Sequence, residues 1–136
     1  MNRKTVVVAD DDDDLRALLC LQLQGFGYRI VEVRDGAALL ELLANFGQRK
    51  LDVIIADVLM PCYSGIGVLG ALRGTEIDIP VIVITARQDE EIARDAIRLG
   101  AVAVFHKPFD IGDLRAAIER ATKRRPRWRE HREIRR

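Results

Sequence analysis

Five short apolar runs, rich in Val and Ile, alternate along almost the whole chain with segments of helical spacing. This alternation constrains the fold more than any other feature. Near-continuous apolar strands are typical of a parallel sheet that is buried on both faces, with helices as the connections. The sequence therefore predicts an α/β sandwich built from five strand-helix units, with right-handed crossovers.

The bounds of the expected elements follow from where each pattern starts and where Gly or Pro interrupts it. Strands are expected over residues 5–9, 28–33, 51–56, 80–85 and 102–105. Helices are expected over residues 14–24, 37–46, 66–73, 90–99 and 110–121. These segments fit a (βα)5 flavodoxin-like doubly wound fold, in which the five-stranded parallel sheet would have the order 2-1-3-4-5.

The length of 136 residues is that of one domain. No apolar stretch approaches the ~20 residues that a membrane helix needs. Residues 1–4 lead directly into a strand instead of a signal peptide, so a cytoplasmic protein is expected. Cys20 and Cys62 lack the spacing of metal ligands and are expected to remain thiols.

The end of the chain differs from the rest in charge. Residues 123–136 contain eight Lys or Arg against two Glu. We expect residues 1–122 to form the domain, and residues 123–136 to be a basic helical extension or the start of a linker. Such a tail could touch an acidic partner, but it offers neither a recognition helix nor a second core. We therefore expect no membrane partner, and no nucleic-acid partner for this chain alone.

Five consecutive aspartates, residues 10–14, directly follow the first apolar run. Carboxylates crowded at the end of a strand repel one another, and a hard cation with oxygen ligands, such as Mg²⁺ or Ca²⁺, relieves that repulsion. The last three members also precede a helix, where Asp12 or Asp13 suits the N-cap and the others suit the first turn. The run is thus expected to divide between a metal site and a helix start.

Polar residues also follow the other strands of the expected sheet. Asp57 ends the third strand, Thr85 ends the fourth, and Lys107 follows the fifth. In open parallel sheets, ligands bind outside the carboxyl ends of the strands. With the order 2-1-3-4-5, strands 1 and 3 are neighbours, so their aspartates should meet with Thr85 and Lys107 facing them. This arrangement suits a cation bound beside an anion.

Four motifs at these strand ends together resemble the receiver domain of two-component response regulators, over residues 4–122. The motifs are VVADDDDDLR at residues 7–16, DVLMP at residues 57–61 with Gly65, ITA at residues 84–86, and KPF at residues 107–109. Each one alone would be weak evidence, but all four in order are highly specific.

The resemblance implies that Asp57 is the phospho-acceptor, a carboxylate nucleophile that takes a phosphoryl group from a phosphohistidine. It also implies that Asp10, Asp11 and Asp57, with the backbone carbonyl of Leu59, hold Mg²⁺. The metal is needed because phosphoryl transfer to a carboxylate brings anions together. Without the resemblance, Asp57 could simply cap the following loop.

The resemblance assigns the remaining residues to phosphate binding and switching. Lys107 would pair with Asp57 and later with a phosphoryl oxygen. Thr85 would be the switch hydroxyl, with Ala86 beside it in the phosphate-binding loop. The Lys107–Pro108 peptide bond is expected to be cis. The simpler interpretations are a surface lysine and a β-branched strand residue.

The sequence departs from the family three residues before Lys107. The family usually has Tyr or Phe there, whereas this chain has Val104 followed by Phe105. Strand alternation should point Phe105 to the opposite face, so it is not expected to replace the missing aromatic. The signal would then leave through the loop after Thr85 and the helix over residues 90–99.

The implied partners are a sensor histidine kinase or a histidine phosphotransfer protein, and a downstream protein target or fused output domain. A homodimer through the helix at 90–99, the strand at 102–105 and the helix at 110–121 is also implied. The chain would be a phospho-accepting signalling domain and not an enzyme. It would be either a stand-alone regulator or the N-terminal receiver of a longer, DNA-binding regulator.

Two other function classes share part of this pattern. A Mg²⁺-dependent aspartyl phosphatase would also use a strand-end aspartate, but it usually has a second aspartate two residues on, where this chain has Leu59. A pseudo-receiver that only binds partners is disfavoured by the complete acidic set at Asp10, Asp11 and Asp57.

Overall fold

The computed structural model describes residues 3–45, 50–60, 64–75, 77–86 and 90–123. Its strands form a parallel sheet in the order β2-β1-β3-β4-β5, which confirms the predicted fold and strand order. The strands are β1 (Thr5–Ala9), β2 (Arg29–Val33), β3 (Val53–Asp57), β4 (Val81–Thr85) and β5 (Ala103–His106).

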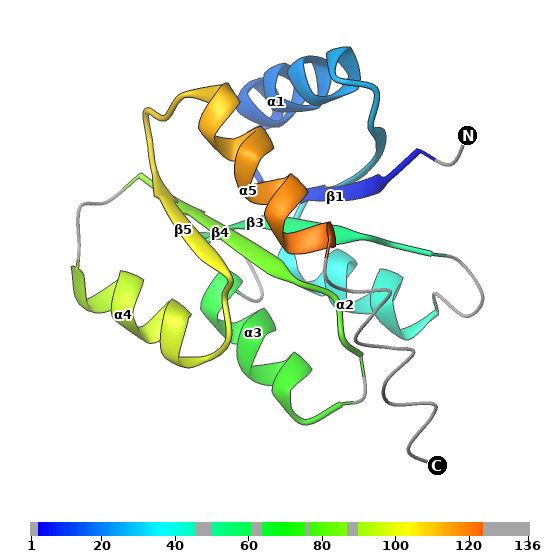
Figure 1. Cartoon of the computed structure of the whole chain (residues 1–136). Coiled ribbons are helices and arrows are strands. Elements are labelled where there is room, and N and C mark those ends of the chain that lie inside the picture. The colour runs from blue at the N-terminus through cyan, green and yellow to red at the C-terminus, as the bar shows by residue number, and fades with distance from the viewer. Residues whose placement is uncertain (1–2, 46–49, 61–63, 76, 87–89, 124–136) are drawn as a thin grey trace.

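Helices cover both faces of this sheet (Figure 1). They are α1 (Asp13–Gly25), α2 (Gly36–Ala44), α3 (Gly65–Arg73), α4 (Glu90–Arg98) and α5 (Ile111–Lys123). Helices α1 and α5 lie on one face, and α2, α3 and α4 lie on the other (Figure 1). In the described ranges, no helix is long and apolar enough to cross a membrane.

Two bounds differ from the sequence-based expectation in an informative way. Strand β3 begins at Val53 instead of residue 51 and includes Asp57. The later start follows from Asp52, whose side chain accepts a hydrogen bond from the Thr5 N–H at 2.7 Å in place of a backbone carbonyl. Lys123, expected to belong to the extension, is the last residue of α5. The other residues of that extension, 124–136, lie outside the described residues.

The start of α1 agrees with the predicted division of the aspartate run. Asp12 is the N-cap, and its side chain accepts hydrogen bonds from the backbone N–H groups of Asp14 and Leu15. Asp13 and Asp14 lie in the first turn, where carboxylates interact favourably with the helix dipole. The last three aspartates of the run therefore begin the helix.

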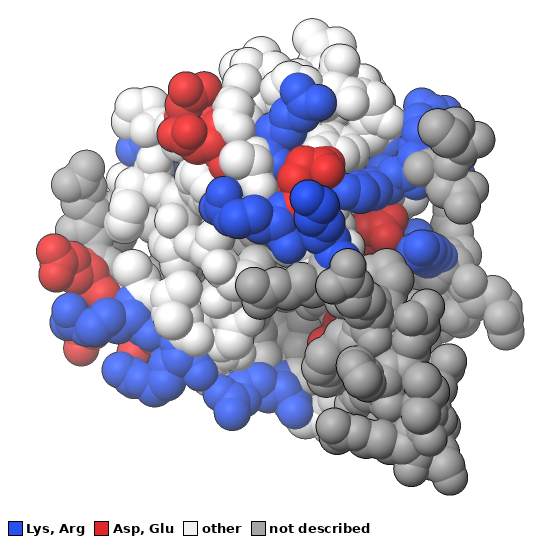
Figure 2. Space-filling view, in the orientation of Figure 1, with Lys and Arg blue, Asp and Glu red and all other residues white. Residues whose placement is uncertain are grey.

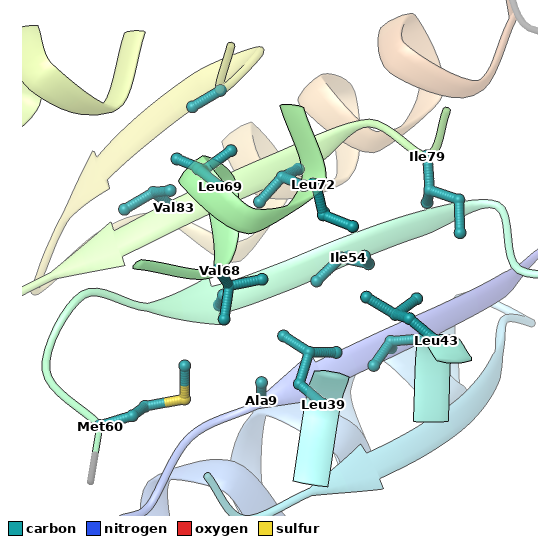
Figure 3. Packing of buried hydrophobic residues seen from close by; sticks show 14 of the residues in the cluster. Ala9, Leu39, Leu43, Ile54, Met60, Val68, Leu69, Leu72, Ile79 and Val83 are labelled. Atoms are coloured by element: carbon teal, nitrogen blue, oxygen red, sulfur yellow. The ribbon is translucent and has the colours of Figure 1, made fainter. Parts of the chain in front are cut away.

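The sheet separates two apolar cores. Alternate residues of β1 divide between them: Val7 and Ala9 face α2, α3 and α4, whereas Val6 and Val8 face α1 and α5. Figure 3 shows the first core, in which side chains of α2 and α3 pack against β1, β3 and β4. Because β1, β3 and β4 are buried along their whole lengths, their ends are held firmly at one edge of the sheet.

Gly65, the first residue of α3, packs directly against the backbone that follows Asp57. A Cβ on Gly65 would lie 2.7 Å from the backbone oxygen of Asp57 and 3.3 Å from the Cα of Val58. The Gly65 N–H also donates to the Val58 carbonyl at 3.2 Å. Gly65 thus lets α3 begin close against the end of β3.

Replacing Gly65 with Ala should destabilise the domain by about 1–3 kcal/mol, because the added methyl group meets backbone atoms that cannot move aside easily. The matched control is Gly70→Ala in the same helix, where no described atom would lie within 4 Å of the new Cβ. That change should stabilise the domain by roughly 0.5–1 kcal/mol through helix propensity. Urea denaturation measures both values, and equal stability of the two variants would contradict the packing described for Gly65.

Candidate functional site

The carboxyl ends of four adjacent strands bring the predicted site residues to one edge of the sheet. Asp10 follows β1, Asp57 ends β3, Thr85 ends β4, and Lys107 follows β5. The side chains of Asp10, Asp57 and Lys107 come together because the strands are parallel and in close register, with Ala9 opposite Ala56 and Asp57 opposite Ile84 in the sheet. Thr85 ends the strand that lies between β3 and β5. Asp10, Asp57 and Thr85 are among the few polar side chains buried in the described part of the chain.

Lys107 links the two buried carboxylates. Its Nζ donates to Asp57 Oδ2 at 2.8 Å and lies 3.5 Å from Asp10 Oδ2. The Lys107 side chain is about one-fifth exposed, and the side chains of Asp10 and Asp57 are less exposed than that. The Lys107–Pro108 peptide bond is cis, the form expected from the resemblance.

The second oxygen of each carboxylate is held by the backbone of its own loop. Asp10 Oδ1 accepts the N–H of Asp12 at 2.9 Å. Asp57 Oδ1 accepts the N–H of Leu59 at 2.8 Å. Both side chains are therefore fixed in orientation, with one oxygen toward the loop and the other toward Lys107.

Two carboxylates beside one ammonium leave an excess of negative charge at a buried position. Burial raises the pKa of Asp10, and the nearby charge of Asp57 raises that pKa further, while the Asp12 N–H and Lys107 act against both. Burial alone would lower the pKa of Lys107, but the hydrogen bond and charge of Asp57 and the charge of Asp10 outweigh it, so this pKa is raised. Lys107 thus stays charged at neutral pH, and the site favours a further cation.

The structure brings together only part of the predicted metal set. Asp10 and Asp57 are neighbours, but the Asp11 side chain is exposed. Across the described ranges, no group of three or more His, Cys, Asp or Glu side chains is arranged to hold a metal ion. Mg²⁺ usually keeps several waters and takes only one or two protein carboxylates, so the donor set and its excess charge fit this ion.

Thr85 lies fully buried at the end of β4, the strand between β3, which ends at Asp57, and β5, which precedes Lys107. Its backbone oxygen accepts the N–H of Lys107 at 2.8 Å, and the neighbouring Ile84 oxygen accepts the N–H of Val58 at 2.8 Å. These bonds tie the ends of β3, β4 and β5 together. Ala86, the next residue, is exposed, and residues 87–89 of the same loop lie outside the described part.

Val104 and Phe105 point to opposite faces of the sheet, as strand alternation predicts. Val104 packs against the core beneath α2, α3 and α4. Phe105 packs in the other core, where its ring meets Phe109 edge-on at 5.7 Å between centroids. Phe105 therefore does not lie where an aromatic side chain at position 104 would lie.

One further residue contacts the acidic loop, although its sequence position suggested no role. Arg16 donates to the backbone oxygen of Asp10 at 2.7 Å and to Asp13 Oδ1 at 2.7 Å. The spacing of three residues from Asp13 signals a helical ion pair. The contact with Asp10 depends on how α1 packs on the sheet, for which the sequence contains no local signal.

Comparison with known proteins agrees with the geometry of the site. The family model of the response regulator receiver domain matches residues 6–119. The chain is 36% identical over 121 residues to the DNA-binding transcriptional regulator NtrC of Escherichia coli, which covers 89% of this chain and 25% of NtrC. It is 38% identical over 125 residues to the transcriptional regulatory protein CpxR of Escherichia coli, covering 92% and 51% of the two chains.

Solved structures match over a similar span. The receiver domain of the Francisella response regulator 1452 superposes with a TM-score of 0.82 at 30% identity, covering 90% of this chain and 98% of that one. The chain thus spans 25% to 51% of the two regulators but nearly all of a separately solved receiver domain. It belongs to the response regulator receiver domain family, a class of signalling modules.

Proposed function

We propose that this receiver accepts a phosphoryl group on Asp57 in a Mg²⁺-dependent reaction and signals by a change of conformation. The donor would be a histidine kinase or a histidine phosphotransfer protein. The observation that carries the proposal is the contact of Lys107 Nζ with the buried carboxylates of Asp57 and Asp10, at 2.8 and 3.5 Å. A lysine and two carboxylates held together at the edge of a sheet suit the binding of a cation and a phosphoryl group.

In the proposed reaction, a carboxylate oxygen of Asp57 attacks the phosphorus of a phosphohistidine. An O–P bond forms, the P–N bond breaks, and the bonding electron pair leaves with the imidazole of the donor. The Leu59 N–H and Lys107 orient the Asp57 carboxylate for this attack. Lys107 would then move its donated hydrogen bond to a phosphoryl oxygen.

Asp10, Asp57 and the backbone carbonyl of Leu59 are the groups proposed to hold Mg²⁺, with Asp11 acting from the exposed side of the loop. A bound Mg²⁺ would neutralise the charge between the carboxylates and the incoming phosphoryl oxygens. Thr85 is proposed as the hydroxyl that donates to the phosphoryl group, with Ala86 beside it. The hydrogen bond from Lys107 N–H to Thr85 oxygen would couple their movements.

The donor protein is proposed to dock on the start of α1. Three large apolar side chains, Leu15, Leu18 and Leu21, are exposed at intervals of three residues along this helix, which begins directly after the acidic loop. Leu59, two residues after Asp57, is also exposed. An apolar surface next to the phosphorylation site suits a helical partner that carries the phosphohistidine.

The output surface is proposed to be the face formed by α4, β5 and α5, as a homodimer or as a contact with a target. Figure 2 shows charges of both signs on this face, on either side of a less charged band. Arg94 of α4 and Arg115 of α5 are exposed, and Asp95 of α4 is half-buried. A face with both signs can be self-complementary in a twofold dimer. Since NtrC and CpxR are longer regulators, a covalently attached output domain is an alternative target.

The proposal predicts which residue is modified. In buffer with Mg²⁺ and a small phosphodonor such as acetyl phosphate, intact-protein mass spectrometry should show one added phosphoryl group on the wild type. Asp57→Ala should gain none, because the nucleophile is absent. Asp113→Asn, which removes an exposed acid from the first turn of α5, should react like the wild type.

Persistent labelling of Asp57→Ala would reject Asp57 as the acceptor. A wild type that gains no phosphoryl group, while Mg²⁺ and the donor are present, would favour a pseudo-receiver that only binds partners.

The charge balance predicts that Asp10→Asn stabilises the domain in Mg²⁺-free buffer at neutral pH, by roughly 0.5–2 kcal/mol, the usual range for relieving an unfavourable charge. The raised pKa of Asp10 means that the folded state binds more protons than the unfolded state between the ordinary value of 3.8 and the raised value. Stability therefore falls as pH rises through this window, and the gain from Asn should vanish below pH 3.8.

With Mg²⁺ added, the wild type should become more stable than Asp10→Asn, because Mg²⁺ stabilises the wild type and has little effect on the variant. Thermal denaturation with and without Mg²⁺ measures this, and Asp113→Asn again serves as the control. An Asp10→Asn variant that is less stable than the wild type without Mg²⁺ would contradict the excess of negative charge at the site.

A further inference from the structure

Arg16, in the first turns of α1, contacts three separate parts of the chain through one planar group. Its Nη1 donates to the backbone oxygen of Asp10 at 2.7 Å, and its Nη2 donates to Asp13 Oδ1 at 2.7 Å. Its Nε donates to Glu32 Oε1 on β2 at 3.0 Å. The Arg16 side chain as a whole is only 11% exposed, although the Asp13 and Glu32 side chains that it contacts are themselves exposed.

These contacts fix the backbone where the acidic loop leaves β1. The N–H of Asp10 donates to the Val33 oxygen of β2, and the oxygen of Asp10 accepts from Arg16. Glu32, which accepts a hydrogen bond from Arg16, lies opposite Val8 in the register of β1 and β2. The residue that carries the buried carboxylate is therefore held from β2 on one side and from α1 on the other.

Arg16 also engages carboxylates that would otherwise add to the repulsion within the aspartate run. It pairs with Asp13 from that run and with Glu32 from the neighbouring strand. A guanidinium presents its N–H groups in a rigid fork, which can meet three acceptors in different directions. A lysine ammonium has the same charge, but its donors all lie on one atom.

We propose that Arg16 is a positioning residue for Mg²⁺ binding, because its fork holds the acidic loop in the conformation in which Asp10 and Asp11 can engage the ion. The inference rests on the Mg²⁺ site proposed above and adds a residue that does not itself contact the ion. Holding the loop in advance removes the ordering cost that a free loop of repelling carboxylates would bring to each binding event.

The direction in which Mg²⁺ affinity changes when Arg16 is replaced shows whether Arg16 acts by positioning the loop or only through its charge. Removing a positive charge from beside carboxylates would, by Coulomb attraction alone, strengthen the binding of a cation. Releasing the loop would weaken it. Arg16→Gln removes both the charge and the fork, and Arg16→Lys keeps the charge while losing the fork. The two variants together therefore distinguish the two effects.

The test is an NMR titration of the full chain with MgCl₂, following backbone amides of the acidic loop, for the wild type, Arg16→Lys and Arg16→Gln. We expect the dissociation constant for Mg²⁺ to rise about tenfold in both variants, as for other residues that orient metal ligands. Arg98→Lys is the matched control, because Arg98 makes a similar helical ion pair with Asp95 on α4 and should leave the constant unchanged.

Two further measurements exclude a general loss of structure. The thermal midpoint without Mg²⁺ should show that Arg16→Lys is folded. This variant therefore shows whether loss of the guanidinium contacts weakens Mg²⁺ binding, even if Arg16→Gln is unstable. At saturating Mg²⁺, Arg16→Lys should be phosphorylated at close to the wild-type rate. A residue that acts through metal binding changes the Mg²⁺ concentration at which phosphorylation is half-maximal, and it leaves the phosphorylation rate at saturating Mg²⁺ unchanged.

Three results would overturn the inference. Wild-type affinity in Arg16→Lys would show that charge suffices, and tighter binding by Arg16→Gln would show that Arg16 opposes the cation. Both leave the proposed metal site intact. A wild type that binds no Mg²⁺ would overturn the proposed metal site and this inference with it.

Discussion

One ammonium facing two buried carboxylates is the interaction on which the site depends. Lys107 lies 2.8 Å from Asp57 and 3.5 Å from Asp10, and all three side chains sit at the edge of a sheet with apolar cores on both faces. Because one positive charge does not balance two negative ones, the site retains negative charge where water is scarce. Such an arrangement is costly for folding, but it favours the binding of a cation and holds the Asp57 carboxylate in a fixed orientation. The stability of the surrounding sheet makes this cost tolerable.

The parallel sheet brings four distant parts of the sequence to one edge. The strands β1, β3 and β4 are fully buried, so small changes in their register would move every charged group at their ends. The loops add the finer orientation: Asp12 and Leu59 each supply a backbone N–H to a carboxylate, and Gly65 lets α3 start against the end of β3. Arg16 of α1 hydrogen-bonds to the Asp10 oxygen after β1, to Asp13 of α1 and to Glu32 of β2, and so connects these three elements. Orientation at this edge therefore comes from both the rigid strands and their short connections.

The sequence predicted the five-unit architecture, because hydrophobic periodicity and strand ends are local signals. The strand order and the meeting of Asp10, Asp57 and Lys107 were predicted from the flavodoxin-like pattern that this architecture suggested. The sequence also predicted that Asp12 or Asp13 would cap α1, and that Val104 and Phe105 would face opposite ways, since both follow from local backbone geometry. It did not predict the start of β3, where the Asp52 side chain replaces a backbone acceptor. It gave Arg16 no role, because the contacts with Asp10 and Glu32 exist only once α1 packs beside β2. Asp11 was expected among gathered carboxylates, whereas its side chain is exposed, since the Asp10 carboxylate turns inward and the next residue turns out.

The proposed phosphorylation of Asp57 requires that Mg²⁺ and Lys107 act together at this carboxylate. The most direct measurement is a crystal structure of the full chain grown with Mg²⁺ and beryllium fluoride, which mimics a phosphoryl group on a carboxylate. We expect beryllium bonded to an oxygen of Asp57, Mg²⁺ in contact with Asp10 and Asp57, and Lys107 and Thr85 in contact with the fluorides. A structure in which Asp57 carries no beryllium while both reagents are bound elsewhere, or in which Lys107 keeps its contact with Asp57 unchanged beside a bound ion, would contradict it.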